Sequence, residues 1–228
     1  MDINTELNYM SLTLGLASLG FARAESYQEA PVGHKPEDIL PGAKSVVTFS
    51  YRMNKGAIKH LPGTRNQYMQ EFTAVNALLL ANVHKITRFL EEKGFESIGI
   101  GPEADIGDYA RLKGDFSHKH SAVLCGLGSF GINNLLITPR HGAWVRLASV
   151  ITTAELNPPE PKAAAPARDC SGCLACVQAC PSGALSRWEG NYDPQRGWVI
   201  DKEKCAHYIF ATCHGKRCGL CVQACPGI

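Results

Sequence analysis

The sequence lacks any apolar run that approaches the roughly 18 residues a membrane-spanning helix needs. Its first ten residues, MDINTELNYM, lack the basic region and the apolar core of a secretory signal peptide, and they contain no twin arginine. These absences predict a cytoplasmic protein that has no membrane partner.

Basic residues are not concentrated anywhere along the chain. Residues 1–164 contain 16 Lys and Arg against 16 Asp and Glu, and residues 165–228 contain 7 against 5. No stripe of positive charge is dense enough to indicate a face that binds nucleic acid. The sequence therefore argues against a DNA partner, and it gives weaker evidence against an RNA partner.

Cysteine is nearly absent until late in the chain. Nine of the ten cysteines lie in residues 170–225, and Cys125 is the tenth. In a reducing compartment such clustering indicates metal binding rather than disulfides. Cys125, within AVLCG, is interpreted as a small buried apolar residue.

Hydrophobic patterns predict a mixture of helices and strands before the cysteine-rich region. The strongest is an apolar stripe over Asn66 to Lys93, which predicts a long helix that ends at Gly94. Another amphipathic helix is expected over residues 6–20, ended by Gly20. Buried strands are expected over residues 45–51 and 144–153, and a further strand over residues 97–101.

A change of composition marks a boundary near residue 160. The stretch NPPEPKAAAPARD, from Asn157 to Asp169, is rich in Pro and Ala and has no periodicity, which is typical of a linker. We therefore expect two domains, residues 1–160 and residues 161–228.

The cysteine-rich region contains a motif and an incomplete copy of it. CSGCLACVQACP begins at Cys170, and CGLCVQACP begins at Cys218 but has one cysteine fewer. In two-cluster ferredoxins, three cysteines at this spacing bind one [4Fe–4S] cluster, and the cysteine before the proline binds the other. The spacing predicts one set formed by Cys170, Cys173, Cys176 and Cys225, and a second formed by Cys180, Cys218, Cys221 and either Cys205 or Cys213. Zinc is the alternative, although a zinc ribbon does not require the third cysteine.

A glycine-rich turn, GLGSFG (Gly126 to Gly131), has only the bare spacing of a dinucleotide-binding fingerprint. That fingerprint requires a strand directly before it, whereas here the preceding segment has a helical pattern. The glycines still indicate a close approach of the backbone to a neighbouring element or to a cofactor.

These stretches together resemble one family. The combination of KHSAVLCGLGSFGINNLLITPRHG, VRLASVITTAEL, CxxCxxCxxxCP and KCAHY…CGLCVQACP is similar to the epoxyqueuosine reductase and reductive dehalogenase family over residues 43–228. The resemblance implies an α+β protein in which a nitroreductase-like α/β sandwich domain precedes a two-cluster bacterial ferredoxin-like domain. It also implies that the two [4Fe–4S] clusters pass electrons to the cobalt of a cobalamin. Flavin mononucleotide is the alternative cofactor, because nitroreductase-like domains also bind it.

The resemblance also assigns roles to particular residues. Family members have a cysteine in a Lys-Cys-x-x-aromatic context, which Lys204 to Tyr208 matches, and this favours Cys205 over Cys213 as the missing ligand. The segment that lines the cofactor corresponds to a stretch that includes Gly126, Gly128, Gly131, Asn133 and Asn134.

The sequence departs from the family pattern in several places. The acidic proton donor of the tRNA-modifying members would fall near Leu112, where no carboxylate aligns, and Asp115 would need a shifted register. A tyrosine found in many relatives is replaced by His141. The sequence ends two residues after Pro226, without the C-terminal extension that those members use for tRNA, so a tRNA partner is not expected.

Reductive cleavage of a bond needs a positioned proton donor as well as electrons. His120 is the first candidate donor and Asp115 the second, while Tyr109, His118 and His141 lie in the same region. A histidine has a suitable unperturbed pKa.

The leading hypothesis is an iron–sulfur oxidoreductase that passes electrons to a corrinoid for reductive chemistry of the epoxyqueuosine reductase type. It would take electrons from an external ferredoxin or flavodoxin and act on a small-molecule substrate. The alternatives are an electron-transfer protein that docks a partner redox protein, and a flavin-dependent reductase.

Overall fold

The computed structural model describes residues 2–102, 114–158 and 169–225. The chain forms two compact units whose segments alternate along the sequence. The first unit comprises residues 1–52, 75–127 and 146–163, and the second comprises residues 53–74, 128–145 and 164–228. The expected domain boundary near residue 160 stays a prediction.

The first unit contains a four-stranded sheet in the order β1 (Ser18–Arg23), β2 (Ser45–Arg52), β6 (Val145–Thr152) and β3 (Ser97–Ile100). Strand β1 pairs antiparallel with β2, with Ser18 opposite Ser50, and β3 pairs antiparallel with β6. The three strands expected from the sequence correspond to β2, β3 and β6. The central strands are buried because apolar and β-branched residues occupy both of their faces.

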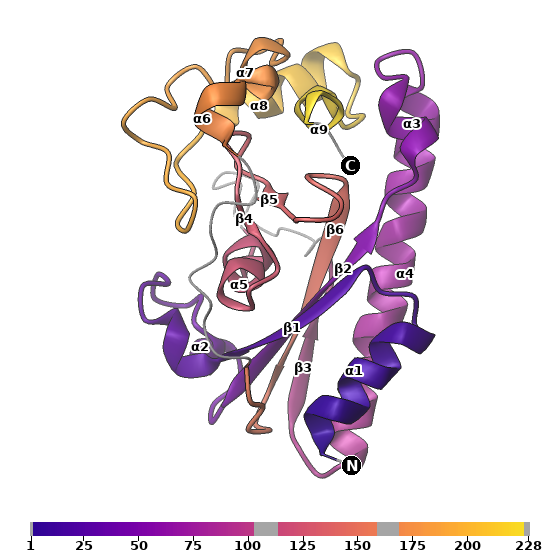
Figure 1. Cartoon of the computed structure of the whole chain (residues 1–228), viewed down its shortest axis with the longest axis vertical. Coiled ribbons are helices and arrows are strands. Elements are labelled where there is room, and N and C mark those ends of the chain that lie inside the picture. Colours follow the sequence, from indigo (N-terminus) through magenta and orange to yellow (C-terminus); the bar gives the residue numbers. More distant parts are fainter. Residues whose placement is uncertain (1, 103–113, 159–168, 226–228) are drawn as a thin grey trace. The chain divides into compact units, whose positions relative to one another are not determined.

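The long helix α4 (Arg65–Glu92) confirms the strongest sequence pattern to within one residue. All seven residues of its stripe are buried: Tyr68, Phe72, Val75, Leu79, Val83, Ile86 and Leu90. Gly94, with φ of +90°, follows its end. In the first unit, α4 covers one face of the sheet, and α5 (His118–Leu124) lies on the other (Figure 1).

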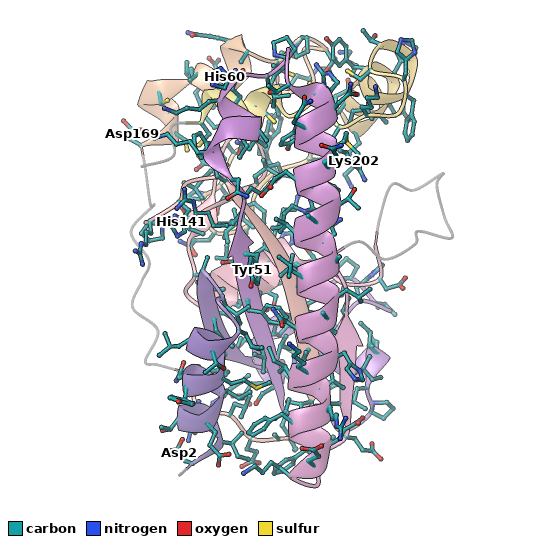
Figure 2. The ribbon with its side chains drawn as sticks, turned by 90° about the vertical axis from the view of Figure 1, so that its right-hand side faces the viewer. Asp2, Tyr51, His60, His141, Asp169 and Lys202 are labelled. Carbon is teal, nitrogen blue, oxygen red and sulfur yellow. The ribbon has the colours of Figure 1, made fainter. Side chains whose placement is uncertain are left out.

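The expected helix over residues 6–20 is wrong in its second half. Helix α1 spans Ile3–Thr13 and is capped by the carboxylate of Asp2, whose side chain is labelled in Figure 2. Gly20 does not end a helix but lies within β1. A Cβ at this position would lie 2.6 Å from the carbonyl oxygen of Cys125, so the glycine allows β1 and the end of α5 to approach closely.

A chain of buried hydrogen bonds crosses the first unit. The hydroxyls of Tyr27 and Ser121 are 2.5 Å apart, those of Ser121 and Thr48 are 2.6 Å apart, and those of Thr48 and Ser149 are 3.0 Å apart. His118 continues it, with Nδ1 2.8 Å from Ser149 Oγ and Nε2 2.7 Å from the carbonyl oxygen of Gly101. Because a carbonyl only accepts, Nε2 carries the proton and Nδ1 accepts from Ser149.

The remaining short helices of the first unit are η1 (Ala24–Tyr27) and α2 (Pro36–Ile39). In the part of the chain that the structure describes, no helix is both long enough and apolar enough to cross a membrane.

The second unit combines a two-stranded antiparallel sheet with short helices. The sheet joins β4 (Ser129–Phe130) and β5 (Leu136–Ile137). The helices, apart from the first turns of α4, are α3 (Lys55–Lys59), α6 (Cys170–Cys173), α7 (Ala175–Gln178), α8 (Lys202–His207), the π-helix η2 (Tyr208–Thr212) and α9 (Leu220–Ala224). Its apolar centre consists of Ile132, Leu185 and Trp198, against which Cys170, Cys176, Cys180 and Cys221 pack.

Candidate metal centre

The two copies of the cysteine motif have the same local backbone geometry. Leu174 follows Cys173 with φ of +49°, and Gly219 follows Cys218 with φ of +70°. Each of these left-handed residues starts a short helix, α7 or α9, whose second residue is the next cysteine. The position that corresponds to Cys170 in the second copy is Gly215, so the fourth thiol must come from elsewhere in the chain.

The first predicted set of cysteines, Cys170, Cys173, Cys176 and Cys225, meets at one cavity. The cavity lining contains all four, together with Ile132, Asn133, Ile137, Asp169, Leu174 and Ala175. Burial, together with the nearby sulfurs of Cys170, Cys225 and Cys173, raises the pKa of the Cys176 thiol to about 11. Cys225, from the second copy, is therefore a neighbour of the first copy, as crossed ligation requires.

The second predicted set consists of Cys180, Cys205, Cys218 and Cys221. Burial, together with the nearby sulfurs of Cys218 and Cys205, raises the pKa of the Cys221 thiol to about 12, and Cys176 and Cys180 contribute less. The pKa of Cys205 is also raised, first by burial and then by Cys180 and Cys218. The sulfurs of Cys180, Cys205 and Cys218 therefore lie near Cys221.

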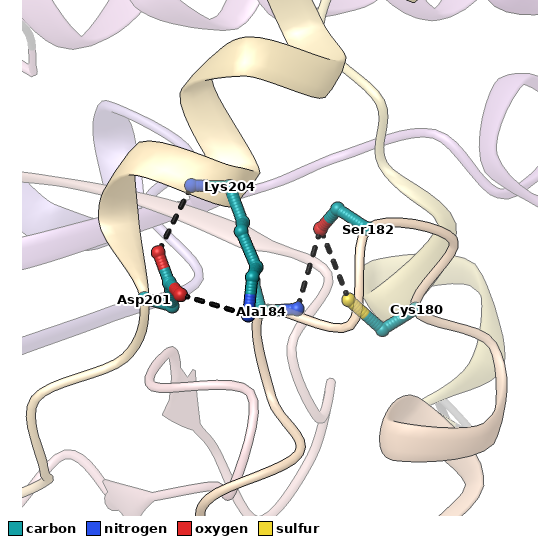
Figure 3. A network of polar contacts seen from close by, with 5 residues as sticks. All are labelled: Cys180, Ser182, Ala184, Asp201 and Lys204. Carbon is teal, nitrogen blue, oxygen red and sulfur yellow. Dashed lines mark hydrogen bonds and ion pairs between the residues drawn. The ribbon is translucent and has the colours of Figure 1, made fainter.

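Polar contacts lie beside Cys180 of the second set and at the start of the helix that carries Cys205 (Figure 3). The hydroxyl of Ser182 lies 3.5 Å from the sulfur of Cys180 and accepts from the amide of Ala184. The carboxylate of Asp201 caps α8 by accepting from the backbone amide of Lys204 at 3.0 Å. It also forms an ion pair with the side chain of Lys204. This cap begins the helix that carries Cys205.

Cys213, the runner-up for the missing ligand, is located differently. It is buried, with 6% of its surface exposed. Burial raises the pKa of its thiol, Arg65 lowers it, and Cys218 is the one cysteine among the causes that raise it. The structure thus brings Cys205 close to more members of the second set than Cys213.

The donor chemistry of both sets fits iron–sulfur clusters. None of the ten cysteines, all within the described residues, forms a disulfide. Among residues 2–102, 114–158 and 169–225, no group of three or more His, Cys, Asp or Glu is placed to hold a metal ion. A [4Fe–4S] cluster binds four thiolates through four different iron atoms, so its ligands stand farther apart than those of one ion.

The residues predicted to bind an organic cofactor have varied surroundings. A Cβ on Gly128 would overlap the carbonyl oxygen of Ile137, and one on Gly131 would lie 2.7 Å from Oδ1 of Asn133. These two glycines are therefore explained by packing within the chain, whereas Gly126 has open space at that position.

The two predicted asparagines make contacts within the second unit. Asn133 is buried, and its Nδ2 donates to the carbonyl oxygen of Cys221 at 3.4 Å. Asn134, with φ of +55°, accepts from the amide of Trp198. Cofactor binding by these five residues stays a prediction.

The candidate proton donors lie at or near the start of α5. His120 is exposed, and its Nδ1 is 2.6 Å from Oγ of Ser117, the N-cap residue. Asp115 is exposed, and its backbone carbonyl oxygen lies 2.8 Å from His34 Nδ1. Tyr109 and Leu112 lie outside the described residues. Cys125 is buried as expected, and burial raises the pKa of its thiol to about 12, which disfavours a nucleophilic thiolate.

Sequence reasoning missed several residues that contact the cysteine-bearing segments. The indole of Trp144 donates to the carbonyl oxygen of Val222 at 2.9 Å, and Tyr192 donates to that of Phe130 at 2.6 Å. The first turn of α4 contributes Arg65, which donates to the carbonyl oxygen of Cys218. No sequence pattern indicates these contacts, because each joins residues more than 60 positions apart.

Comparisons with known proteins agree with this geometry. The 4Fe-4S dicluster domain family matches residues 169–227. Tetrachloroethene reductive dehalogenase from Desulfitobacterium hafniense is 29% identical over 223 residues, covering 92% of this chain and 36% of that protein. Epoxyqueuosine reductase from Bacillus cereus is 25% identical over 233 residues, covering 89% of this chain and 55% of that protein. The relatives found for this chain thus include epoxyqueuosine reductases and reductive dehalogenases.

Solved structures show the same fold. An epoxyqueuosine reductase bound to a tRNA stem loop has a TM-score of 0.65 at 21% identity, covering 97% of this chain and 64% of that one. A reductive dehalogenase whose structure suggests a mechanism for B12-dependent dehalogenation has a TM-score of 0.65 at 17% identity, covering 95% and 30%. The resemblance and the α+β fold with a ferredoxin-like region near its C-terminus are thereby confirmed.

The chain spans 36% and 55% of the length of these two curated relatives. The tRNA-bound neighbour bears on one expectation, because tRNA is a ligand of a protein with this fold. That finding counts mildly against the expectation that this protein has no tRNA partner.

Proposed function

We propose that this protein is an iron–sulfur reductase in which two [4Fe–4S] clusters deliver electrons to a corrinoid for a reductive reaction of the epoxyqueuosine reductase type. The first set, Cys170, Cys173, Cys176 and Cys225, would hold one cluster. The second set, Cys180, Cys205, Cys218 and Cys221, would hold the other.

One observation carries the iron–sulfur part of this proposal. Cys225 ends the second copy of the motif, yet it lines the same cavity as the three cysteines of the first copy. Crossed ligation of this kind is the arrangement of two-cluster ferredoxins, and it brings the two clusters close together. A zinc ribbon, which binds one ion with four ligands, gives no reason for such a crossing.

The chain's own residues have distinct roles in this arrangement. Iron binding requires thiolates, and burial raises the pKa values of Cys176 and Cys221 well above that of a free thiol. Metal binding must therefore displace protons from these sulfurs. The apolar centre formed by Ile132, Leu185 and Trp198 limits the access of water to the sulfurs.

The corrinoid is supported by the relatives and not by a contact in this structure. When bound, it would supply a low-valent cobalt that accepts one electron at a time. Among the residues expected to line it, Gly126 alone has open space where a side chain would project. His120 and Asp115 are the proposed proton donors, since both are exposed and near this turn in the sequence.

The test is an anaerobic purification of the whole chain with iron, sulfide, zinc, cobalt and flavin quantified. About eight iron atoms per chain, with matching sulfide, are expected for two clusters. An absorption spectrum recorded with and without added cobalamin then tests the corrinoid. Stoichiometric zinc in a colourless protein would contradict the proposal, and bound flavin without cobalt would replace the corrinoid by flavin mononucleotide.

The substrate is tested separately with an epoxyqueuosine-modified tRNA stem loop, the ligand of the structural neighbour. Reduction of the modified base would identify a tRNA substrate. If the stem loop is unchanged in the presence of cobalamin and a reduced ferredoxin, the reductive reaction acts on another substrate.

A further inference from the structure

A segment far upstream of the motif contacts the second copy of the motif. Residues 53–74, which contain α3 and the first turns of α4, belong to the same compact unit as the nine clustered cysteines. Gln223 of α9 donates from Nε2 to the carbonyl oxygens of Lys59, at 3.0 Å, and Leu61, at 2.6 Å. The segment that carries Cys221 is thus anchored outside the region that the dicluster family covers.

Arg65 makes the most direct contact with a predicted ligand. Its Nη1 donates to the carbonyl oxygen of Arg217 at 3.1 Å and to that of Cys218 at 2.9 Å. Arg65 is half-buried, so these bonds are partly shielded from water. Hydrogen bonds donated by a charged guanidinium are stronger than those between neutral groups.

These two bonds also set the direction of two peptide groups. In a planar trans peptide the N–H points opposite to the carbonyl. Because Arg65 binds the carbonyls of Arg217 and Cys218, the amide N–H groups of Cys218 and Gly219 point away from its guanidinium. The orientation of such N–H groups around a cluster's sulfurs is one of the factors that set its reduction potential.

Other contacts of α4 hold the same turn. The amide of Arg217 donates to Sδ of Met69 at 3.2 Å, and the guanidinium of Arg217 lies 5.4 Å from the ring centre of Phe72. Gly219 lies so close to Tyr68 that a Cβ there would be 2.7 Å from the ring. The turn therefore has little freedom to change its backbone direction.

We propose that Arg65 is a positioning residue for the second set of cysteines, which fixes the Cys218 turn and thereby the reduction potential of the cluster bound there. This inference rests on the proposed function, because it requires that set to bind a cluster. Loss of the guanidinium removes a positive charge and frees two carbonyls, and both changes disfavour the addition of an electron.

The test compares Arg65→Gln, Arg65→Lys and Arg88→Gln in the whole chain purified anaerobically. Arg88 is the matched control, because it is on the same helix but exposed and pairs with Glu92. Iron content is measured together with the midpoint potential of each cluster by a redox titration followed by electron paramagnetic resonance. The Cys205→Ala protein shows which signal belongs to the second set.

We expect Arg65→Gln to shift the midpoint potential of the second cluster to more negative values and to leave the first unchanged. Arg65→Lys keeps the charge but loses the planar fork, so its shift should be smaller. Should Arg65→Gln prevent assembly of that cluster, iron would fall from about eight to about four atoms per chain. The midpoint potential of the second cluster would then be measured in Arg65→Lys instead.

Unchanged potentials and iron in Arg65→Gln would overturn the inference, as would equal shifts of both clusters. Neither result affects the proposed function, which is tested by the iron, sulfide, zinc, cobalt and flavin content of the wild-type protein.

Discussion

The indole Nε1 of Trp144 donates a hydrogen bond of 2.9 Å to the carbonyl oxygen of Val222. Trp144 lies directly before β6, and Val222 lies in α9 between Cys221 and Cys225. The bond therefore ties the chain before the last strand to the helix that presents two predicted ligands. Trp144 is buried, so its partner carbonyl has no ready replacement in water.

Replacing Trp144 by Phe should weaken the attachment of α9. The change leaves a buried carbonyl without its donor, which costs about 1–3 kcal/mol. We expect clusters to be lost faster to an iron chelator, measured by the decay of the visible absorption under anaerobic conditions. Trp188→Phe serves as the control because it removes an indole that packs at the apolar centre. Equal rates in wild type and Trp144→Phe would show that this bond does not hold the helix.

The fourth ligand of the second set is tested by removing each candidate thiol. Cys205→Ala should lower the iron content from about eight to about four atoms per chain, because one cluster loses a ligand. Cys213→Ala should keep about eight, because fewer members of the second set lie near Cys213 than near Cys205. A loss of iron in Cys213→Ala alone would reverse the assignment.

Gly219 is expected to be intolerant of any side chain. Leu174 has a similar left-handed backbone at the corresponding position of the first copy, so this conformation alone does not demand glycine. A Cβ at residue 219, however, would lie 2.7 Å from the ring of Tyr68 and 2.8 Å from Leu61. Gly219→Ala should therefore reduce the iron bound by the second set.

Gly215→Ala is the matched control for this substitution. Gly215 also has a positive φ, of +78°, but open space surrounds the position of its Cβ. Gly215→Ala should lower the stability of the fold only by the conformational strain, about 1–2 kcal/mol. The variant should keep its full iron content. If the two variants retain the same iron, the contact with Tyr68 does not restrict the turn.

His118 should make the stability of the fold depend on pH. Burial, which is opposed by the bond to the Gly101 carbonyl and assisted by the charge of Arg146, lowers the pKa of His118 to about 4. The unfolded chain, with a pKa near 6.5, takes up the proton first. The contribution of neutral His118 to the free energy of unfolding is therefore fully present above about pH 6.5. It falls by about 3 kcal/mol as the pH drops toward 4.

The measurement is the urea midpoint of the whole chain at several pH values between 7 and 4.5, compared with that of His118→Gln. Carboxylates titrate in both proteins, so the difference between the two curves isolates the histidine. The wild-type midpoint should fall more steeply than that of the variant. Parallel curves would mean that His118 is not held neutral in the fold.

Local patterns in the sequence were sufficient for several elements. The apolar stripe of α4 and the apolar runs of β2 and β6 predicted where these elements begin and end to within one residue. The prediction works because a buried face requires apolar residues at regular intervals along the whole element. The strand that contains Gly20 was missed, because its glycine resembles a helix stop. Only the close approach of Cys125, a residue distant in sequence, explains that glycine.

The sequence by itself determined which residues could bind metal, since the spacing of cysteines within each copy is a local property of one short loop and helix. The tertiary structure decided which cysteines lie near one another: it brought Cys225 to the cavity of the first copy, and it placed Cys205 near Cys180 and Cys218. It also decided that Arg65 contacts the Cys218 turn. Such contacts depend on how segments far apart in the sequence pack together. A local pattern along the chain contains no information about that packing.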